Sequence, residues 1–195
     1  MSPEARRSLP PVLLLHNLDP SWTSADAGSV RDAVAQLTAA LQGGGRRVIE
    51  APVTSQDLAR TLAPFDPAGC IVFNWCEELP GCPHSEVQVV RELEKRGFTY
   101  TGSPAEVLSL SWDKEAVKTR LAAHGVPTPR WRLFDAGSPL DWQGFPAIVK
   151  PACEHSSAGM DTNAVVLEPA ALQRRVAHIQ TAFRQPALVE DFIDG

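Results

Sequence analysis

A short apolar strand and the polar loop after it read IVKP at residues 148–151 and CEHSSAGM at residues 153–160. Lys150 follows the apolar part of this strand, so its ammonium is predicted to lie above the layer that the strand belongs to. The loop adds two hydroxyls, a glycine and a run of backbone N–H groups, which together can bind polyphosphate oxygens. Taken alone, the lysine is better explained as a surface group, and the loop equally well as a polar hairpin.

The residues around this stretch predict an α+β unit. Four apolar runs predict strands, at residues 131–134, 147–150, 164–167 and 187–190. Before the last of them, a helix that opens at Pro169 carries Leu172, Val176, Ile179 and Phe183 on one face. Hairpin-like loops join some of the strands, which favours an antiparallel sheet.

Residues 10–103 show a different pattern, in which apolar runs alternate with helical ones. The predicted strands are 12–15, 47–50, 70–74 and 98–101. This alternation predicts a doubly wound, Rossmann-like parallel sheet with helices on both faces. The glycines at 43–45 follow a helix and are interpreted as its end, not as a phosphate loop. Two shorter helices are predicted to begin at capping pairs, Thr54 with Asp57 and Ser85 with Gln88.

Composition excludes several classes of function. The hydrophobic fraction is 44%, the charged fraction 21% and the net charge −5, with no basic cluster that would indicate nucleic-acid binding. No apolar run is long enough to span a membrane or to act as a signal peptide, so a cytoplasmic protein is expected. Cys76, Cys82 and His84 lie close together, but their spacing matches no zinc pattern, and no metal site is predicted.

Two further segments carry groups that suit a nucleotide. Lys114 lies at the start of a helix and is a second candidate partner for phosphate. The stretch VEDFIDG at residues 189–195 ends a strand in acceptors beside an apolar pair. The Glu190 carboxylate can accept from the exocyclic amine of a purine, and backbone groups near residues 192–193 can read the ring edge. Each segment alone is better explained as an exposed helix lysine or an acidic turn.

In their order and spacing, these features resemble the ATP-grasp ligases, most closely the D-alanine–D-alanine ligase-like proteins. The order is DK at residues 113–114, VKP at 149–151, ExSSxGM at 154–160 and VEDFIDG at 189–195. Supporting matches are YTGS at residues 100–103 followed by WDK at 112–114, and HGVPTP at 124–129. The resemblance covers nearly the whole chain and is strongest from Tyr100 onward.

The resemblance implies a fold and a set of ATP-binding residues. It implies a pre-ATP-grasp α/β domain at residues 1–103 and an incomplete α+β ATP-grasp domain at 104–195. Lys114 and Lys150 would contact the phosphates of ATP. The loop over the phosphates would contain Glu154, Ser156, Ser157 and Gly159, and the adenine pocket would contain Glu190, Asp191, Phe192 and Ile193.

The implied activity is ADP-forming ligation of a carboxylate to an amine through an acyl phosphate, in cytoplasmic peptidoglycan biosynthesis. ATP, Mg²⁺ and an amino acid such as D-alanine are the implied ligands, and a homodimer is the suggested assembly. The catalytic residues and the Mg²⁺ ligands are expected beyond Gly195, so this chain is expected to be a truncated, inactive form that binds ATP.

The first domain departs from the family pattern and leaves the substrate open. LHNLDP at residues 15–20 stands where the family has a glycine-rich stretch with a glutamate, and NWCEELPG at 74–81 replaces its H-G…E-D-G pattern. Glu86 is a candidate for the carboxylate of that pattern. Two alternatives therefore stay open: another ATP-grasp ligase with a different amino-acid substrate, and a non-catalytic nucleotide-binding module.

Overall fold

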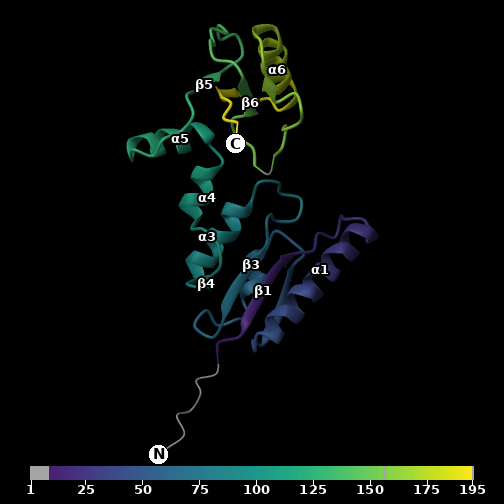
Figure 1. Cartoon of the computed structure of the whole chain (residues 1–195). Helices are drawn as coiled ribbons and strands as arrows, with labels where there is room; N and C mark the ends of the chain where they lie inside the picture. The colour runs from purple at the N-terminus through teal and green to yellow at the C-terminus, as the bar shows by residue number, and fades with distance from the viewer. Residues whose placement is uncertain (1–8, 156, 195) are drawn as a thin grey trace, which may run out of the picture. The chain divides into compact units, whose positions relative to one another are not determined.

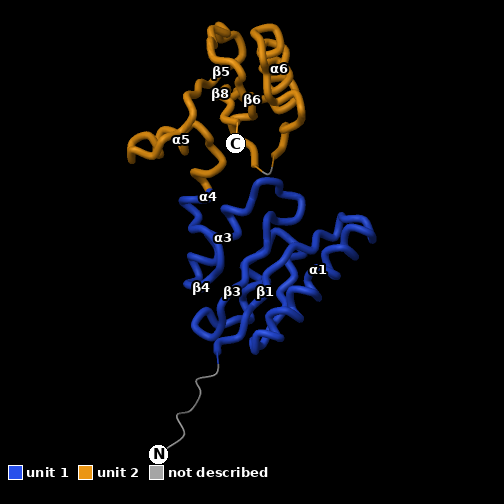
Figure 2. Tube along the Cα trace, viewed as in Figure 1, with its two compact units in different colours: residues 1–108 blue, residues 109–195 orange. Residues whose placement is uncertain are grey.

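The computed structural model describes residues 9–155 and 157–194, which form a mixed α/β structure (Figure 1). The chain divides into two compact units, residues 1–108 and 109–195 (Figure 2). Each unit has its own four-stranded sheet and its own apolar core. Within the described residues, no helix combines the length and the apolar character needed to cross a bilayer.

A parallel sheet forms the centre of unit 1, in the strand order β2-β1-β3-β4. Its strands are β1 (Val12–Asn17), β2 (Val48–Val53), β3 (Ile71–Trp75) and β4 (Thr99–Tyr100). Leu14 of β1 pairs with Glu50 on one side and with Phe73 on the other. Because β1 is buried on both faces, its apolar run is uninterrupted, as expected for a central parallel strand. The predicted parallel sheet is confirmed.

Helices lie on both faces of this sheet (Figure 1). They are α1 (Ser24–Gly43), α2 (Leu58–Leu62) and α3 (Glu86–Arg96). The helix α4 (Ala105–Ser111) follows β4 and continues past residue 108. One core cluster joins Leu13 and Leu15 to buried residues of α2 and α3. Leu14 points to the opposite face, because side chains alternate along a strand. Val34 is the one buried residue of α1 among those described.

Both predicted capping pairs in unit 1 are wrong. The cap of α2 is Asp57 alone, whose carboxylate accepts from the Arg60 N–H at 3.0 Å. At the start of α3, Ser85 occupies the cap position but makes no side-chain capping bond. Its buried hydroxyl donates to the Cys82 carbonyl and accepts from the Leu79 N–H at 2.7 Å. The hydroxyl therefore forms hydrogen bonds with backbone groups of the loop before the helix and not with the end of the helix.

Unit 2 contains an antiparallel sheet in the order β5-β8-β6-β7, as predicted. Its strands are β5 (Trp131–Phe134), β6 (Ala147–Pro151), β7 (Val165–Val166) and β8 (Ala187–Asp191). The strand predicted at residues 164–167 is thus shorter than expected. The central strands β6 and β8 pair Ile148 with Glu190 and Lys150 with Leu188.

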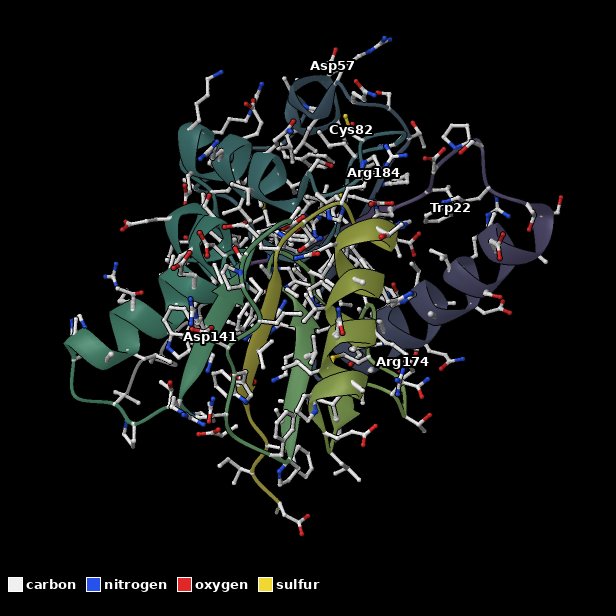
Figure 3. All side chains as sticks on the ribbon, turned by 90° about the horizontal axis from the view of Figure 1, so that it is seen from above. Trp22, Asp57, Cys82, Asp141, Arg174 and Arg184 are labelled. Carbon is white, nitrogen blue, oxygen red and sulfur yellow. The ribbon has the colours of Figure 1, made fainter. Side chains whose placement is uncertain are left out.

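Two helices complete unit 2, α5 (Lys114–Ala123) and α6 (Pro169–Ala182). The apolar face of α6 packs on the sheet through Leu172, Val176 and Ile179, which confirms the predicted stripe. Arg174 projects from the exposed face of α6 (Figure 3), whereas its neighbour Arg175 is buried.

Candidate functional site

The strand pairing of β6 with β8 places Lys150 beside Glu190. Glu190 lies directly opposite Ile148, and Lys150 is two residues further along the same face, so the two charged residues are diagonal neighbours. The Lys150 Nζ forms an ion pair with Glu190 Oε1. The predicted phosphate-binding lysine is therefore in contact with the predicted adenine-binding carboxylate.

Lys118 of α5 holds the other oxygen of the same carboxylate. Its Nζ lies 2.5 Å from Glu190 Oε2, and the Glu190 residue is only 5% exposed. Burial by itself raises the pKa of Glu190, but the hydrogen bonds and charges of Lys118 and Lys150 outweigh it and hold the pKa below its ordinary value. Glu190 is thus an ionised carboxylate between two ammonium groups.

Lys114 is placed by the start of α5. The Asp113 carboxylate caps the helix by accepting from the Ala116 N–H at 2.9 Å, and the Lys114 N–H donates to the Ala152 carbonyl at 3.1 Å. The Lys114 Nζ donates to the Pro151 carbonyl at 2.9 Å and to the Glu154 carbonyl. Burial lowers the pKa of Lys114 from its usual 10.5. This ammonium therefore ties α5 to the base of the polar loop.

The polar loop after β6 is held at its far end by Arg175. The guanidinium donates to the Gly159 carbonyl and lies 3.1 Å from the Asp161 carboxylate. Gly159 has a φ of +71°, and a Cβ at this position would lie 2.8 Å from Phe183 Cζ and 2.9 Å from Pro151 Cγ. Glycine is therefore required here both by the backbone conformation and by the close packing.

A cavity of about 420 Å³ lies between β6, the start of α5 and this loop. Its lining residues are Ser111, Lys114, Lys150, Pro151, Glu154, His155, Ser157, Ala158 and Met160. The His155 ring stands edge-on to Trp112 with centroids 4.0 Å apart, and its buried Nε2 has no hydrogen-bond partner among the described residues. The volume is within the usual range for small-molecule sites.

The predicted site residues differ in their relation to this cavity. Lys114, Lys150, Glu154 and Ser157 line it, Glu190 is joined to it through Lys150, and Gly159 lies in the loop that borders it. Ser156 lies outside the described residues.

The last three predicted positions have other contacts. The Asp191 carboxylate lies 2.9 Å from Arg130, and the Phe192 N–H donates to the Pro146 carbonyl at 3.1 Å. Ile193 is 67% exposed. The Phe192 N–H is therefore already bonded to a backbone carbonyl.

Two charged residues near the site, Lys118 and Arg175, were not predicted from the sequence. Lys118 follows Lys114 by four residues, which places both on one face of a helix, and this spacing was a usable signal. Arg175 lies inside an apolar helical pattern, where a buried guanidinium gives no sequence signal.

Within residues 9–155 and 157–194, no group of three or more His, Cys, Asp or Glu side chains is arranged to hold a metal ion. Magnesium needs several oxygen ligands in octahedral geometry. Glu154 is the only carboxylate among the described lining residues, and its Oε1 accepts from Gln185 at 2.9 Å.

Comparison with known proteins identifies relatives. An uncharacterized protein of Sinorhizobium fredii, y4sG, is 36% identical over 175 residues, which is 86% of this chain and 50% of that protein. The D-alanine–D-alanine ligase of Ralstonia pickettii is 38% identical over 109 residues, 53% of this chain and 31% of the ligase. No protein-family profile matches the sequence. The chain thus spans half or less of the length of these relatives.

Solved structures show the same fold. The D-alanine–D-alanine ligase of Bacillus anthracis superposes with a TM-score of 0.68 at 20% identity, over 96% of this chain and 59% of the ligase. The same ligase in complex with ATP gives a TM-score of 0.66 at 18% identity. The predicted fold class is confirmed by this match, and the ATP-grasp resemblance by the ligase relatives.

Proposed function

We infer that this chain, a D-alanine–D-alanine ligase-like relative with the ATP-grasp fold, binds ATP in the cavity between β6, the start of α5 and the loop at residues 153–160. One observation carries the proposal: two lysines from separate elements, Lys114 and Lys150, line one cavity beside a loop that supplies a hydroxyl and backbone N–H groups. Ammonium and N–H donors that converge in this way match the chemistry of a polyphosphate.

ATP binding is proposed to exchange the partners of Lys150. In the structure its Nζ is paired with Glu190 Oε1. A polyphosphate carries more negative charge than one carboxylate, so Lys150 turns to the phosphates and releases Oε1. The freed oxygen can then accept from the exocyclic amine of adenine, while Lys118 keeps Oε2 and holds the carboxylate in place.

The activity that this binding serves is proposed to be carboxylate–amine ligation through an acyl phosphate, as in D-alanine–D-alanine ligases. ATP with Mg²⁺ and an amino acid are the proposed ligands, a homodimer the proposed assembly, and residues 1–103 and 104–195 the proposed domains. The chain spans only half or less of its relatives. We therefore propose that these 195 residues bind ATP without completing ligation.

Replacement of Lys150 by methionine is expected to raise the Kd for ATP about tenfold to hundredfold, because a hydrogen bond to a charged partner contributes about 1.5–3 kcal/mol. A fluorescent ATP analogue measures this directly on the 195-residue chain. Lys95→Met is the control: it removes the same charge from a side chain of unit 1 that is 78% exposed, and it should leave the Kd unchanged. Equal affinities of the two variants would place the nucleotide elsewhere.

As pH rises, ATP binding is expected to decline at a lower pH than it would if Lys114 had the usual pKa of a lysine. The pKa of Lys114 lies below 10.5, so its ammonium loses its proton at a lower pH and with it the attraction for phosphate. Titrating the ATP analogue between about pH 7 and pH 10 measures the decline. Lys114→Arg keeps its charge over this range and should move the decline to higher pH. Superimposable profiles of the two proteins would argue against a role for Lys114.

Ligation is tested separately, with a longer protein that includes the remaining length of the relatives. Phosphate release from ATP should be stimulated by D-alanine if the substrate is that of the ligase relatives. Stimulation by another amino acid alone would keep the ligase class and reject the dipeptide product. This second outcome is favoured by the stretches LHNLDP at residues 15–20 and NWCEELPG at 74–81, which depart from the pattern of the ligases.

A further inference from the structure

Unit 2 has a second cavity, of about 350 Å³, between α6, β7 and the turn that follows the polar loop. Its polar and charged lining residues are Asp161, Thr162, Asn163, Arg174, Arg175 and His178. The proposed ATP site is lined instead by Lys114, Lys150 and the loop up to Met160. Because the two cavities have no lining residue in common within the described chain, the second cavity can hold a ligand of its own.

Two nitrogen-bearing side chains of α6 lie side by side at this cavity. Arg174 and His178 are four residues apart, about one helical turn, so they lie on one face of the helix. Both residues are exposed, and Figure 3 shows Arg174 on the outer side of α6. Neither side chain forms an ion pair or a hydrogen bond with another described residue. Their N–H groups are therefore available to a ligand.

The only carboxylate among the described lining residues is Asp161, and it is already engaged. Its Oδ1 accepts from the Asn163 N–H at 2.9 Å and lies 3.1 Å from Arg175 Nη1. Partial burial raises the pKa of Asp161, but the Asn163 N–H and the charge of Arg175 outweigh burial and lower the pKa. Asp161 thus balances Arg175, which leaves Arg174 without a counter-charge and the cavity positive.

The edge of the sheet adds neutral hydrogen-bond donors. β7 is the last strand in the order β5-β8-β6-β7, so it forms an edge of the sheet. The Ala164 carbonyl accepts from the Val149 N–H at 2.8 Å, and bonding directions alternate along an antiparallel ladder, so the Val165 N–H points away from β6. The Thr162 hydroxyl and the Asn163 amide also line the cavity, and neither side chain has a hydrogen-bond partner within the described ranges.

The cavity also has an apolar wall, formed by Val165, Val166 and Ala171. Its volume exceeds what one phosphate group occupies and lies in the range of small-molecule sites. A ligand that fills it therefore combines an anionic group for the N–H and O–H donors with a small apolar group for the valines.

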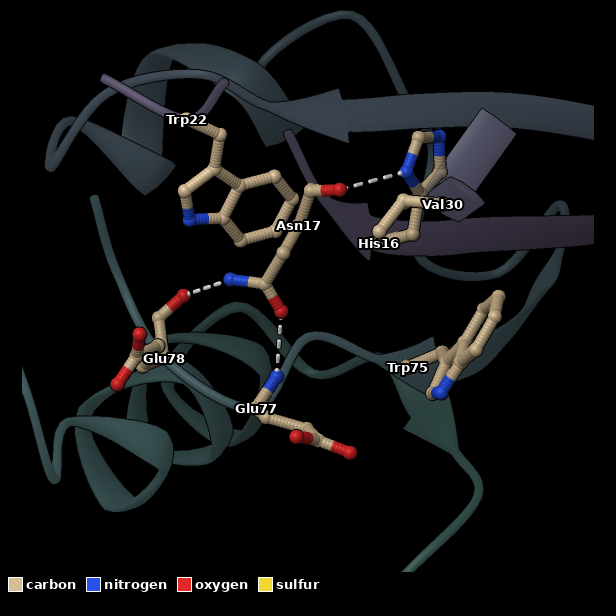
Figure 4. A pocket seen from close by; sticks show the side chains of 7 residues that line it. All are labelled: His16, Asn17, Trp22, Val30, Trp75, Glu77 and Glu78. Atoms are coloured by element: carbon tan, nitrogen blue, oxygen red, sulfur yellow. Dashed lines mark hydrogen bonds between the residues drawn. The ribbon is translucent and has the colours of Figure 1, made fainter. Parts of the chain in front are cut away.

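The cavity of unit 1 has the opposite charge (Figure 4). It has a volume of about 300 Å³, and its lining includes Glu77 and Glu78 but, within the described residues, no lysine or arginine. The Asn17 side chain bonds only to backbone groups of these glutamates, so their carboxylates keep their charge. An anion is therefore expected to bind beside α6 and not in unit 1.

We propose that the cavity between α6 and β7 binds a phosphate monoester with a small apolar or aromatic group. The phosphate accepts from the Arg174 guanidinium, from the His178 ring and from the neutral donors at residues 162–165, and the apolar group packs on the valines of β7. A phosphate is favoured over a carboxylate because it carries up to about two charges and three acceptor oxygens for this set of donors. The site does not depend on the proposed ATP site, so failure of one leaves the other untouched.

Titration of the full chain, followed through its amide signals by nuclear magnetic resonance, tests the proposal with three probes: phenyl phosphate, inorganic phosphate and benzoate. Phenyl phosphate should shift the signals of residues 161–166 until they saturate, and it should bind at least about tenfold more tightly than benzoate. Inorganic phosphate should bind severalfold more weakly than phenyl phosphate, because it buries no apolar surface. Benzoate or inorganic phosphate binding as tightly as phenyl phosphate, shifts that do not saturate, or shifts confined to the ATP cavity or to unit 1 would overturn the proposal.

Substitutions at exposed positions locate the binding. Arg174→Gln removes one charge from the cavity and should raise the Kd of phenyl phosphate about tenfold without unfolding the chain. His178→Gln should raise the Kd severalfold. Arg91→Gln is the matched control, because it removes the same charge from an exposed arginine of unit 1 that lies outside the cavity, and it should change nothing. An unchanged Kd in Arg174→Gln, or an equal loss of affinity in Arg91→Gln, would contradict the proposed site.

Discussion

Glu190→Gln is expected to lower the free energy of unfolding by about 3 kcal/mol. Glu190 is 5% exposed and its two oxygens are paired with Lys118 and Lys150, whose side chains are 12% and 28% exposed. Removing one partner of a buried ion pair leaves uncompensated charge and typically costs about 3–5 kcal/mol. The partial exposure of Lys150 places the expected loss at the low end. Urea unfolding followed by tryptophan fluorescence measures it.

Asp191→Asn is the matched control for this variant. It removes the same charge from the adjacent residue, but the Asp191–Arg130 pair has side chains that are 34% and 57% exposed. Water screens such a surface pair, so the loss of stability should be far smaller. Equal losses of stability in both variants would show that burial of the Lys118–Glu190–Lys150 cluster adds nothing to the free energy of unfolding.

The free energy of unfolding at low pH provides a second test of the stabilisation by Glu190. Its pKa is lower in the folded chain than its usual 4.5. The folded state therefore binds this proton less readily than the unfolded state, and the stabilisation is present above the unfolded pKa. It is lost as pH falls from there through the lower folded pKa. Glu190→Gln should lack this part of the pH dependence.

The strands of both units were predictable because each is a short apolar run with a turn or helix signal on either side. β1 and β6 are examples: both are apolar, and both lie centrally in their sheets. The capping pair at Thr54 failed because Asp57 itself caps α2, and the pair at Ser85 failed for a different reason. A serine hydroxyl bonds wherever a donor and an acceptor are nearest, and for Ser85 these belong to the loop before the helix.

The individual residues of the site were predictable from the sequence, but the ion pairs between them were not. Lys150 and the loop are adjacent in sequence, so their proximity follows from the chain itself. The contact of Lys150 with Glu190 depends on the register of β6 against β8, and the contact with Lys118 on where α5 packs. Neither is set by local spacing.

Gly159→Ala is expected to destabilise the chain by about 2–5 kcal/mol, because two separate costs add. The φ of +71° is unfavourable for alanine by about 1–2 kcal/mol. The new Cβ would also lie 2.8 Å from Phe183 Cζ and 2.9 Å from Pro151 Cγ, and relieving such overpacking costs about 1–3 kcal/mol. Urea unfolding measures the sum.

Gly137→Ala separates these two costs. Gly137 has a φ of +84°, but its Cβ would meet no atom within 4 Å among the described residues, so this variant carries only the backbone penalty. The difference between the variants is then the collision with Phe183 and Pro151. Because Pro151 adjoins Lys150 and Gly159 is bonded to Arg175, relieving the collision displaces the loop from the lysines. Gly159→Ala should therefore weaken ATP binding about tenfold whereas Gly137→Ala should not, and equal ATP affinities would separate the loop from the nucleotide site.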